Sequence, residues 1–130
     1  MKLRRLEHID IVCADLTAST EFYRKLGLSP EGTLEEGSVV FMFNGDDTSP
    51  VRIELHQAQD GQKTGVDHIA FDVADTDAAY SEGKYLGLEF RVEPIQNMQS
   101  GRRIVNLYDP DGVQLQFAQK TLPGEYQEWE

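Results

Sequence analysis

The sequence is poor in cysteine, in basic residues and in long apolar runs. Cys13 is the one cysteine among 130 residues, which excludes an intramolecular disulfide and a cysteine zinc cluster. No run approaches the roughly 18 consecutive apolar residues of a membrane span. The start, MKLRRLEHI, is basic but lacks the apolar core of a signal peptide. We therefore expect a cytoplasmic protein that does not bind membranes.

The charge balance is strongly acidic. Asp and Glu number 23 against 12 Lys and Arg, and the formal net charge is −11. Such a chain repels a phosphate backbone unless its basic residues are segregated, and the basic clusters here are only Lys2-Arg4-Arg5 and Arg102-Arg103. We expect no nucleic-acid partner. A hydrophobic content of 39% fits one globular domain of this length.

The main feature of the sequence is an internal repeat. LEHIDIVCADLTASTEFYRKLGL, residues 6–28, aligns without a gap with VDHIAFDVADTDAAYSEGKYLGL, residues 66–88. The offset is 60 residues, so His8 aligns with His68 and the Leu-Gly-Leu endings coincide. A repeat of this length indicates one supersecondary unit present twice. We predict a first module over about 4–57, a second over about 66–119, and a polar tail over 120–130 within a single domain.

Each copy reads as strand, helix and three strands. Residues 6–14 alternate as a strand does, and residues 17–26 have helical spacing, with Asp15 or Thr17 as the N-cap. Further strands are predicted at 38–44 and 50–57, with a weak or edge strand over 29–36. In the second copy, Asp75 or Thr76 caps the helix, strands follow at 89–93, 102–108 and 113–118, and 95–101 is a loop. The predicted class is α+β, with helices covering one face of each sheet.

Four polar side chains occupy equivalent places in the two modules. His8 and Glu54 lie on the polar faces of the first and last strands of the first module, and His68 and Gln116 do so in the second. Histidines on a polar strand face are often only solvated, but here two of them are related by the repeat. Two imidazoles, a carboxylate and an amide oxygen would suit Zn²⁺, Ni²⁺, Co²⁺, Mn²⁺ or Fe²⁺.

Four motifs in order carry a family resemblance: residues 6–28, RIELHQ at 52–57, GVDHIAFDVADTDAAY at 65–80, and NLYDPDGVQLQF at 106–117. Together they resemble the vicinal oxygen chelate superfamily, also called the glyoxalase/bleomycin-resistance/dioxygenase superfamily, over about residues 4–119. The resemblance implies paired βαβββ modules that form curved half-barrel sheets. It also implies a divalent metal held by His8, Glu54, His68 and Gln116, and a homodimer.

The chain departs from the glyoxalase I pattern at Gln116, where that family usually has a glutamate. A glutamine cannot take up a proton at neutral pH, so Glu54 is the one ligand-position carboxylate left as catalytic base. The expected function is a metal-dependent, glyoxalase-like lyase or isomerase that acts on a small oxygenated substrate through a metal-bound enediolate.

Other readings stay open. The resemblance also covers non-catalytic proteins of the bleomycin-resistance kind that sequester a small molecule, although these generally lack both histidines. Gln116 counts against extradiol dioxygenases and against transferases of the fosfomycin-resistance kind, and it leaves room for an accessory domain with a vestigial site. Arg52 and Arg103 are candidates for binding a substrate carboxylate or phosphate, although such residues are several times more often only solvated at the surface.

Overall fold

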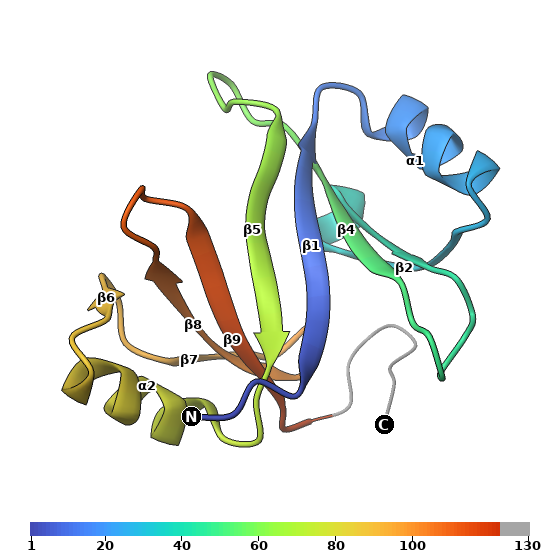
Figure 1. The fold of residues 1–130 in the computed structure, drawn as a ribbon. Coiled ribbons are helices and arrows are strands. Elements are labelled where there is room, and N and C mark those ends of the chain that lie inside the picture. The colour runs from blue at the N-terminus through green and yellow to red at the C-terminus, as the bar shows by residue number, and fades with distance from the viewer. Residues whose placement is uncertain (123–130) are drawn as a thin grey trace. The chain divides into compact units, whose positions relative to one another are not determined.

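The computed structural model describes residues 1–122, and most of the predicted tail lies outside this range. Nine strands and two α-helices occur in the described part of the chain, with one short 3₁₀ turn. In chain order these elements are β1 (Arg5–Cys13), α1 (Leu16–Lys25), β2 (Ser29–Leu34), η1 (Glu35–Gly37), β3 (Val39–Phe43), β4 (Arg52–Gln57), β5 (Gly65–Asp72), α2 (Thr76–Tyr85), β6 (Glu89–Phe90), β7 (Ile95–Asn97), β8 (Arg102–Tyr108) and β9 (Gln114–Lys120) (Figure 1).

The chain divides into two compact units. The first unit, as named here, is residues 8–67, and the second unit is residues 1–7 together with residues 68–122. The first residues of β1 are therefore exchanged into the second unit, apart from the rest of that strand. Arg4 pairs with Asp72 at 2.8 Å, and the buried Glu7 pairs with the buried Arg102 at 3.5 Å.

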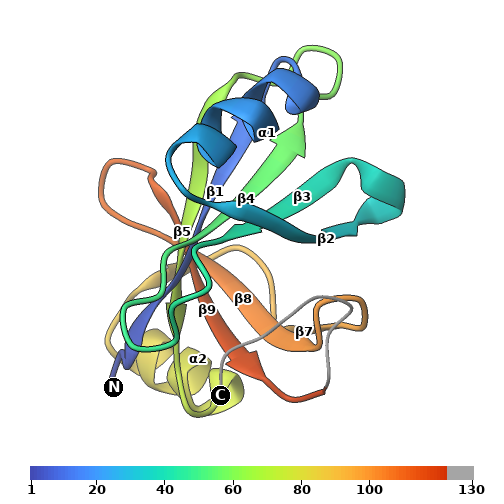
Figure 2. The ribbon, with the colours of Figure 1, turned by 90° about the vertical axis from the view of Figure 1, so that its right-hand side faces the viewer.

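In the first unit, the strand order is β2-β3-β4-β1. The β2–β3 and β3–β4 pairs are antiparallel and β4–β1 is parallel. Helix α1 packs on one face of these strands (Figure 2). Alternation directs the apolar side chains of β1 and β4 to that face, where the packed residues are Ile11, Cys13, Leu16, Tyr23, Leu28, Val40, Met42, Ile53 and Leu55. Cys13 is thus a packing residue.

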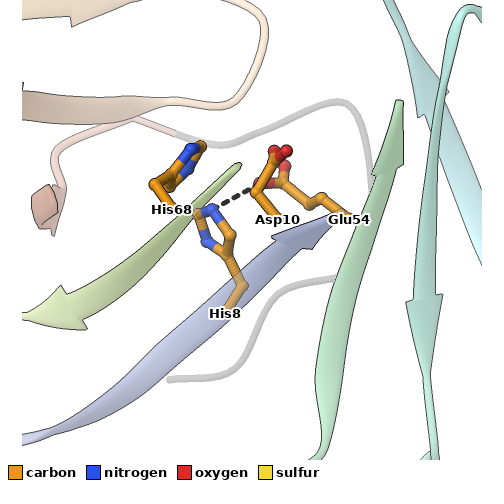
Figure 3. Close-up of side chains that lie close together, drawn as sticks. All are labelled: His8, Asp10, Glu54 and His68. Atoms are coloured by element: carbon orange, nitrogen blue, oxygen red, sulfur yellow. Dashed lines mark ion pairs between the residues drawn. The ribbon is translucent and has the colours of Figure 1, made fainter. Parts of the chain in front are cut away.

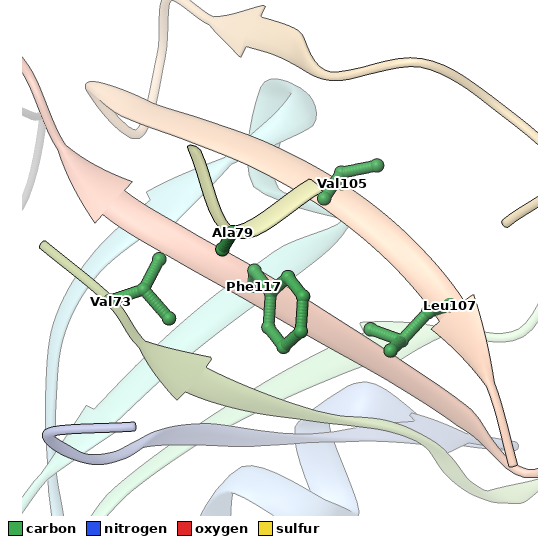
Figure 4. Close-up of a cluster of buried hydrophobic side chains, with 5 residues drawn as sticks. All are labelled: Val73, Ala79, Val105, Leu107 and Phe117. Atoms are coloured by element: carbon green, nitrogen blue, oxygen red, sulfur yellow. The ribbon is translucent and has the colours of Figure 1, made fainter. Parts of the chain in front are cut away.

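In the second unit, the strand order is β5-β9-β8-β6, and β7 also pairs with β8. The β5–β9 pair is parallel and the others are antiparallel. The core under α2 consists of Val73, Ala79, Val105, Leu107 and Phe117 (Figure 4). Strand β7 corrects the expected loop over 95–101, and the strand expected over 89–93 is limited to Glu89–Phe90. Both segments pair with β8, and no local sequence pattern indicates which strands are its partners.

The helices begin in the same way in both units. Asp15 Oδ1 accepts from Ala18 N at 3.2 Å, and Asp75 Oδ1 accepts from Ala78 N at 3.0 Å. Each carboxylate satisfies a backbone N–H that has no intrahelical partner. Past the helix ends, Gly27 and Gly87 adopt φ of 100° and 81°, a conformation that glycine tolerates best. The 60-residue repeat is therefore a structural repeat.

The two helices differ where they pack on the second strand of each module. Gly83 lies under Phe90, so that a Cβ at this position would be 2.8 Å from Phe90 Cζ. The repeat aligns Tyr23 with Gly83 and Pro30 with Phe90. The first module thus has the larger residue on the helix, and the second module has it on the strand. The glycine that weakens α2 as a helix gives the Phe90 ring its space.

Candidate metal centre

The first feature of the site is a buried pair between β1 and β4. The two strands are parallel, with Asp10 opposite Glu54. His8, two residues before Asp10, lies on the same face, and its Nε2 is 2.6 Å from Glu54 Oε2. His8 is 6% exposed and Glu54 is 7% exposed. The structure therefore brings together the two site residues predicted in the first module.

A second pair lies beside the first. His56, two residues after Glu54, contacts Asp10 through its Nε2 and the carboxylate Oδ2. Asp10 is buried and His56 is half-buried. Sequence analysis did not single out Asp10 as a site residue. Its place on the polar face of β1 was visible from the alternation, but its position opposite Glu54 depends on the parallel register, which the sequence does not give.

The carboxylates shift the pKa of His56. Burial alone would lower it, but the hydrogen bond and charge of Asp10 raise it, and the charges of Glu54 and Glu35 raise it further. The result is a pKa above the ordinary value of 6.5. Glu35 lies in η1, where Glu35 and Glu36 have positive φ of 50° and 56°. Three acidic residues thus favour a cationic imidazole on this face.

Arg52 adds a positive charge to the same face of the first unit. It precedes Glu54 by two residues on β4 and is 4% exposed. Its guanidinium carbon lies 4.4 Å from the ring centroid of Phe41 and 5.6 Å from that of Phe43. These are cation–π distances. The two rings belong with Leu34 and Val39 to a buried apolar cluster, so this face is part charged and part apolar.

The second unit repeats the register of the first with different chemistry. Strands β5 and β9 are parallel with Ala70 opposite Gln116, so His68 stands to Gln116 as His8 stands to Glu54. His68 is half-buried. Gln116 is buried, and its Nε2 donates to Asn106 Oδ1 at 3.1 Å. Here the second unit has the neutral amide of Gln116 where the first unit has the carboxylate of Glu54.

The two neighbouring arginines of β8 point to opposite faces. Arg103 lies on the face covered by α2, where it forms a bidentate pair with Asp77 at 3.0 and 3.1 Å. Arg102 shares a face with Asn106 and is buried against Glu7. Of the two arginines predicted to bind substrate, Arg52 lies on the face that carries the site residues and Arg103 does not.

The donor set of the first unit fits a divalent cation. His8, Asp10 and Glu54 each offer one ligand atom, and these atoms lie within 4.8 Å of one another. In Figure 3, His8 and Asp10 extend from β1 and Glu54 from β4, and His68, also drawn, belongs to β5. One imidazole nitrogen and two carboxylate oxygens suit Zn²⁺, Mn²⁺, Fe²⁺, Co²⁺ or Ni²⁺.

No helix in the described part of the chain has the length and apolar character needed to cross a bilayer.

Comparison with solved structures identifies similar folds. The chain is similar to a methylmalonyl-CoA epimerase from Streptomyces coelicolor in complex with 2-nitronate-propionyl-CoA, with 28% identity, a TM-score of 0.72, and coverage of 93% of this chain and 100% of the other. A Mn(II)-bound glyoxalase from Novosphingobium aromaticivorans has a TM-score of 0.74 at 20% identity, with coverage of 99% of this chain and 43% of that one. These likenesses confirm the α+β class predicted from the repeat and the glyoxalase-like fold implied by the family resemblance.

Curated relatives and a family model point the same way. YwkD of Bacillus subtilis, an uncharacterized protein, is 30% identical over 127 residues, which cover 90% of this chain and 98% of YwkD. YwbC of the same organism, also uncharacterized, is 28% identical over 124 residues and 98% of its length. The model of the Glyoxalase/Bleomycin resistance protein/Dioxygenase superfamily matches residues 5–117. The chain therefore belongs to the Glyoxalase/Bleomycin resistance protein/Dioxygenase superfamily.

Proposed function

We propose that this chain is a metal-dependent, glyoxalase-like enzyme that moves a proton at a carbon beside a carbonyl group of a small oxygenated substrate. The observation that carries the proposal is the buried contact of 2.6 Å between His8 Nε2 and Glu54 Oε2. Burying an imidazole and a carboxylate costs free energy, and titratable groups buried in this way cluster at functional sites.

The proposed ligands are His8, Glu54, His68 and Gln116. Three things support the set: the family, the N/O donors, and the strand register. In each unit, the histidine lies two residues before the residue that pairs with Glu54 or Gln116. Asp10 is a further candidate from the first unit. When bound, a divalent cation would polarise the substrate carbonyl and lower the free energy of the enolate that forms on loss of the proton.

The proposed catalytic base is Glu54. Gln116 has no basic oxygen, so the second module supplies no carboxylate at the equivalent place. In the proposed reaction, a carboxylate oxygen of Glu54 takes the proton from the substrate carbon. In an isomerisation it returns the proton to the neighbouring carbon, and in an epimerisation a second acid or water delivers a proton to the opposite face of the same carbon. Glu54 is 7% exposed, so bulk water has little access to the carboxylate that would take the proton.

Arg52 is proposed to bind an anionic group of the substrate. It lies on the same face as Glu54, and the rings of Phe41 and Phe43 hold its guanidinium plane. A carboxylate or phosphate can bind a guanidinium through two parallel hydrogen bonds. Arg103 is left out of the proposed site because it pairs with Asp77 on the helix-covered face.

Two reactions fit this chemistry. One is lactoylglutathione lyase-like isomerisation of a hemithioacetal, expected from the family resemblance but weakened by Gln116. The other is epimerisation beside a thioester carbonyl, which the 28% identity with a methylmalonyl-CoA epimerase favours. Both begin with loss of a proton from a carbon beside a carbonyl group, so both are included in the test.

The first experiment is metal analysis by mass spectrometry on protein purified without a histidine tag. We expect near-stoichiometric metal that is lost in His8→Ala and in His68→Ala. His56→Ala is the comparison variant. This histidine is outside the proposed ligand set but contacts Asp10, so it shows whether metal binding depends on that neighbouring pair.

Activity assays then follow with methylglyoxal and glutathione, and with methylmalonyl-CoA in D₂O, where deuterium uptake reports proton abstraction. No metal after incubation with Mn²⁺, Ni²⁺, Co²⁺ and Zn²⁺ would refute the enzyme and favour a small-molecule-binding protein of the bleomycin-resistance kind. The resemblance also predicts a homodimer, which light scattering after size exclusion tests.

A further inference from the structure

The residues opposite Glu54 and Gln116 differ in a way that matches the chemistry of each. Glu54 on β4 stands opposite Phe41 on the antiparallel strand β3, and Gln116 on β9 stands opposite Asn106 on the antiparallel strand β8. Phe41 has no hydrogen-bonding atom. Asn106 accepts a hydrogen bond from Gln116 Nε2 at 3.1 Å. The carboxylate therefore has an apolar cross-strand neighbour, and the amide has a polar one.

An amide has an orientation problem that a carboxylate does not have. Both carboxylate oxygens are acceptors, so a glutamate presents a ligand atom whichever way its end group turns. A glutamine presents either an oxygen, which binds a cation, or an NH₂ group, which does not. The two orientations have nearly the same shape, so packing alone selects poorly between them, and a hydrogen-bond partner must do so.

We infer that Asn106 is a positioning residue that holds the Gln116 amide with its nitrogen on Asn106 and its oxygen Oε1 turned to the cation. The inference rests on the proposed function, in which Gln116 is a metal ligand. Gln116 is 6% exposed, so water competes little for its NH₂ group. Asn106 makes the glutamine a usable ligand at a place where the family usually has a glutamate.

The expected effect is set by the hydrogen bond that is lost. Partners that orient metal ligands typically change metal affinity by about 10-fold to 100-fold when they are removed. Asn106→Leu keeps the branch point at Cγ and removes the acceptor. Asn106→Asp keeps an acceptor and has no donor, so it still requires the nitrogen of Gln116 to face it.

The test is the Kd of Mn²⁺ alone, measured by isothermal titration calorimetry on the full chain. We expect Asn106→Leu to raise the Kd by about 10-fold or more, and Asn106→Asp to bind at least as tightly as the wild type. The deciding variant is Gln116→Glu, alone and combined with Asn106→Leu. A carboxylate needs no orientation, so the leucine should raise the Kd in the glutamate background by less than about 2-fold.

Each outcome has one meaning. An equal loss of affinity in the glutamine and glutamate backgrounds would overturn the inference, because Asn106 would then act through packing. An unchanged Kd in Asn106→Leu, with the wild type binding Mn²⁺, would also overturn it and leave the proposed function standing. If the wild type binds neither Mn²⁺ nor Ni²⁺, Co²⁺ or Zn²⁺ titrated in its place, the proposed function is overturned, and the role of Asn106 with it. Circular dichroism and thermal unfolding of each variant identify any that fails to fold.

Discussion

Replacement of Gly83 by alanine has two opposing effects on the free energy of unfolding, a gain in helix propensity and a cost of overpacking. Gly83 lies in the last turn of α2, and within a helix alanine is favoured over glycine by up to about 1 kcal/mol. The new Cβ would lie 2.8 and 2.9 Å from Phe90 Cζ and Cε2, and 3.3 Å from Leu88 Cδ1. Overpacking of this kind typically costs about 1–3 kcal/mol. Packing should therefore outweigh helix propensity, and Gly83→Ala should destabilise the protein by up to about 2 kcal/mol.

The Phe90 ring has little room to move away. It packs edge-on against Tyr80, with centroids 4.9 Å apart, and lies 6.2 Å from the Phe117 ring in the core of the second unit. Urea unfolding followed by far-UV circular dichroism gives the free energy of unfolding for each variant.

The matched control is Gly83→Ala in a Phe90→Leu background. Without the ring edge, the helix term should dominate and the alanine should stabilise by up to about 1 kcal/mol. The reasoning is refuted if Gly83→Ala stabilises the protein with Phe90 present, because the ring would then yield at no cost.

Three further predictions concern pairs described above. Asp15→Ala and Asp75→Ala should each lower the free energy of unfolding by about 1 kcal/mol, since they remove equivalent N-caps, and chemical denaturation would show unequal caps if the values differ widely. Glu7→Ala should cost about 3–5 kcal/mol, because it leaves a buried guanidinium without its carboxylate, and a loss below about 1 kcal/mol in the same assay would contradict this. Arg103→Gln should raise the pKa of Asp77 from its lowered position toward 3.8, as read by carboxyl NMR. The ion pair of Asp77 with Arg103 stabilises the fold above pH 3.8, and this contribution is lost as the pH falls through the lowered pKa of folded Asp77. An unchanged Asp77 pKa in Arg103→Gln would contradict the pairing.

The repeat explains why so much of the fold was visible in the sequence. Capping aspartates, C-terminal glycines and strand alternation are local signals, and two copies of each signal support one another. The extra strand β7 has no such copy, and its pairing with β8 depends on tertiary structure. The sequence also predicted the two faces of β1 and β4, and with them the common face of His8 and Glu54.

The parts of the site that were missed depend on register. That Asp10 stands opposite Glu54, and Asn106 opposite Gln116, follows from how strands align, which no single-strand pattern encodes. For Arg102 and Arg103, alternation requires opposite faces but does not say which residue takes which face. The odd-numbered residues Val105 and Leu107 of β8 face the core under α2, so Arg103 lies on that face as well and Arg102 on the other.

The exchange of residues 1–7 has a consequence for the order in which the chain is made. Translation proceeds at about 5–20 residues per second from the N-terminus. Arg4 and Glu7 therefore leave the ribosome before any residue of the first unit, but their partners Asp72 and Arg102 leave after all of its described residues. The later part of β1 can pair with β4 before the partners of its first residues have been synthesised. During synthesis, the first residues of β1 therefore lack their ion-pair partners, and they can pair only after β5 and β8 have left the ribosome.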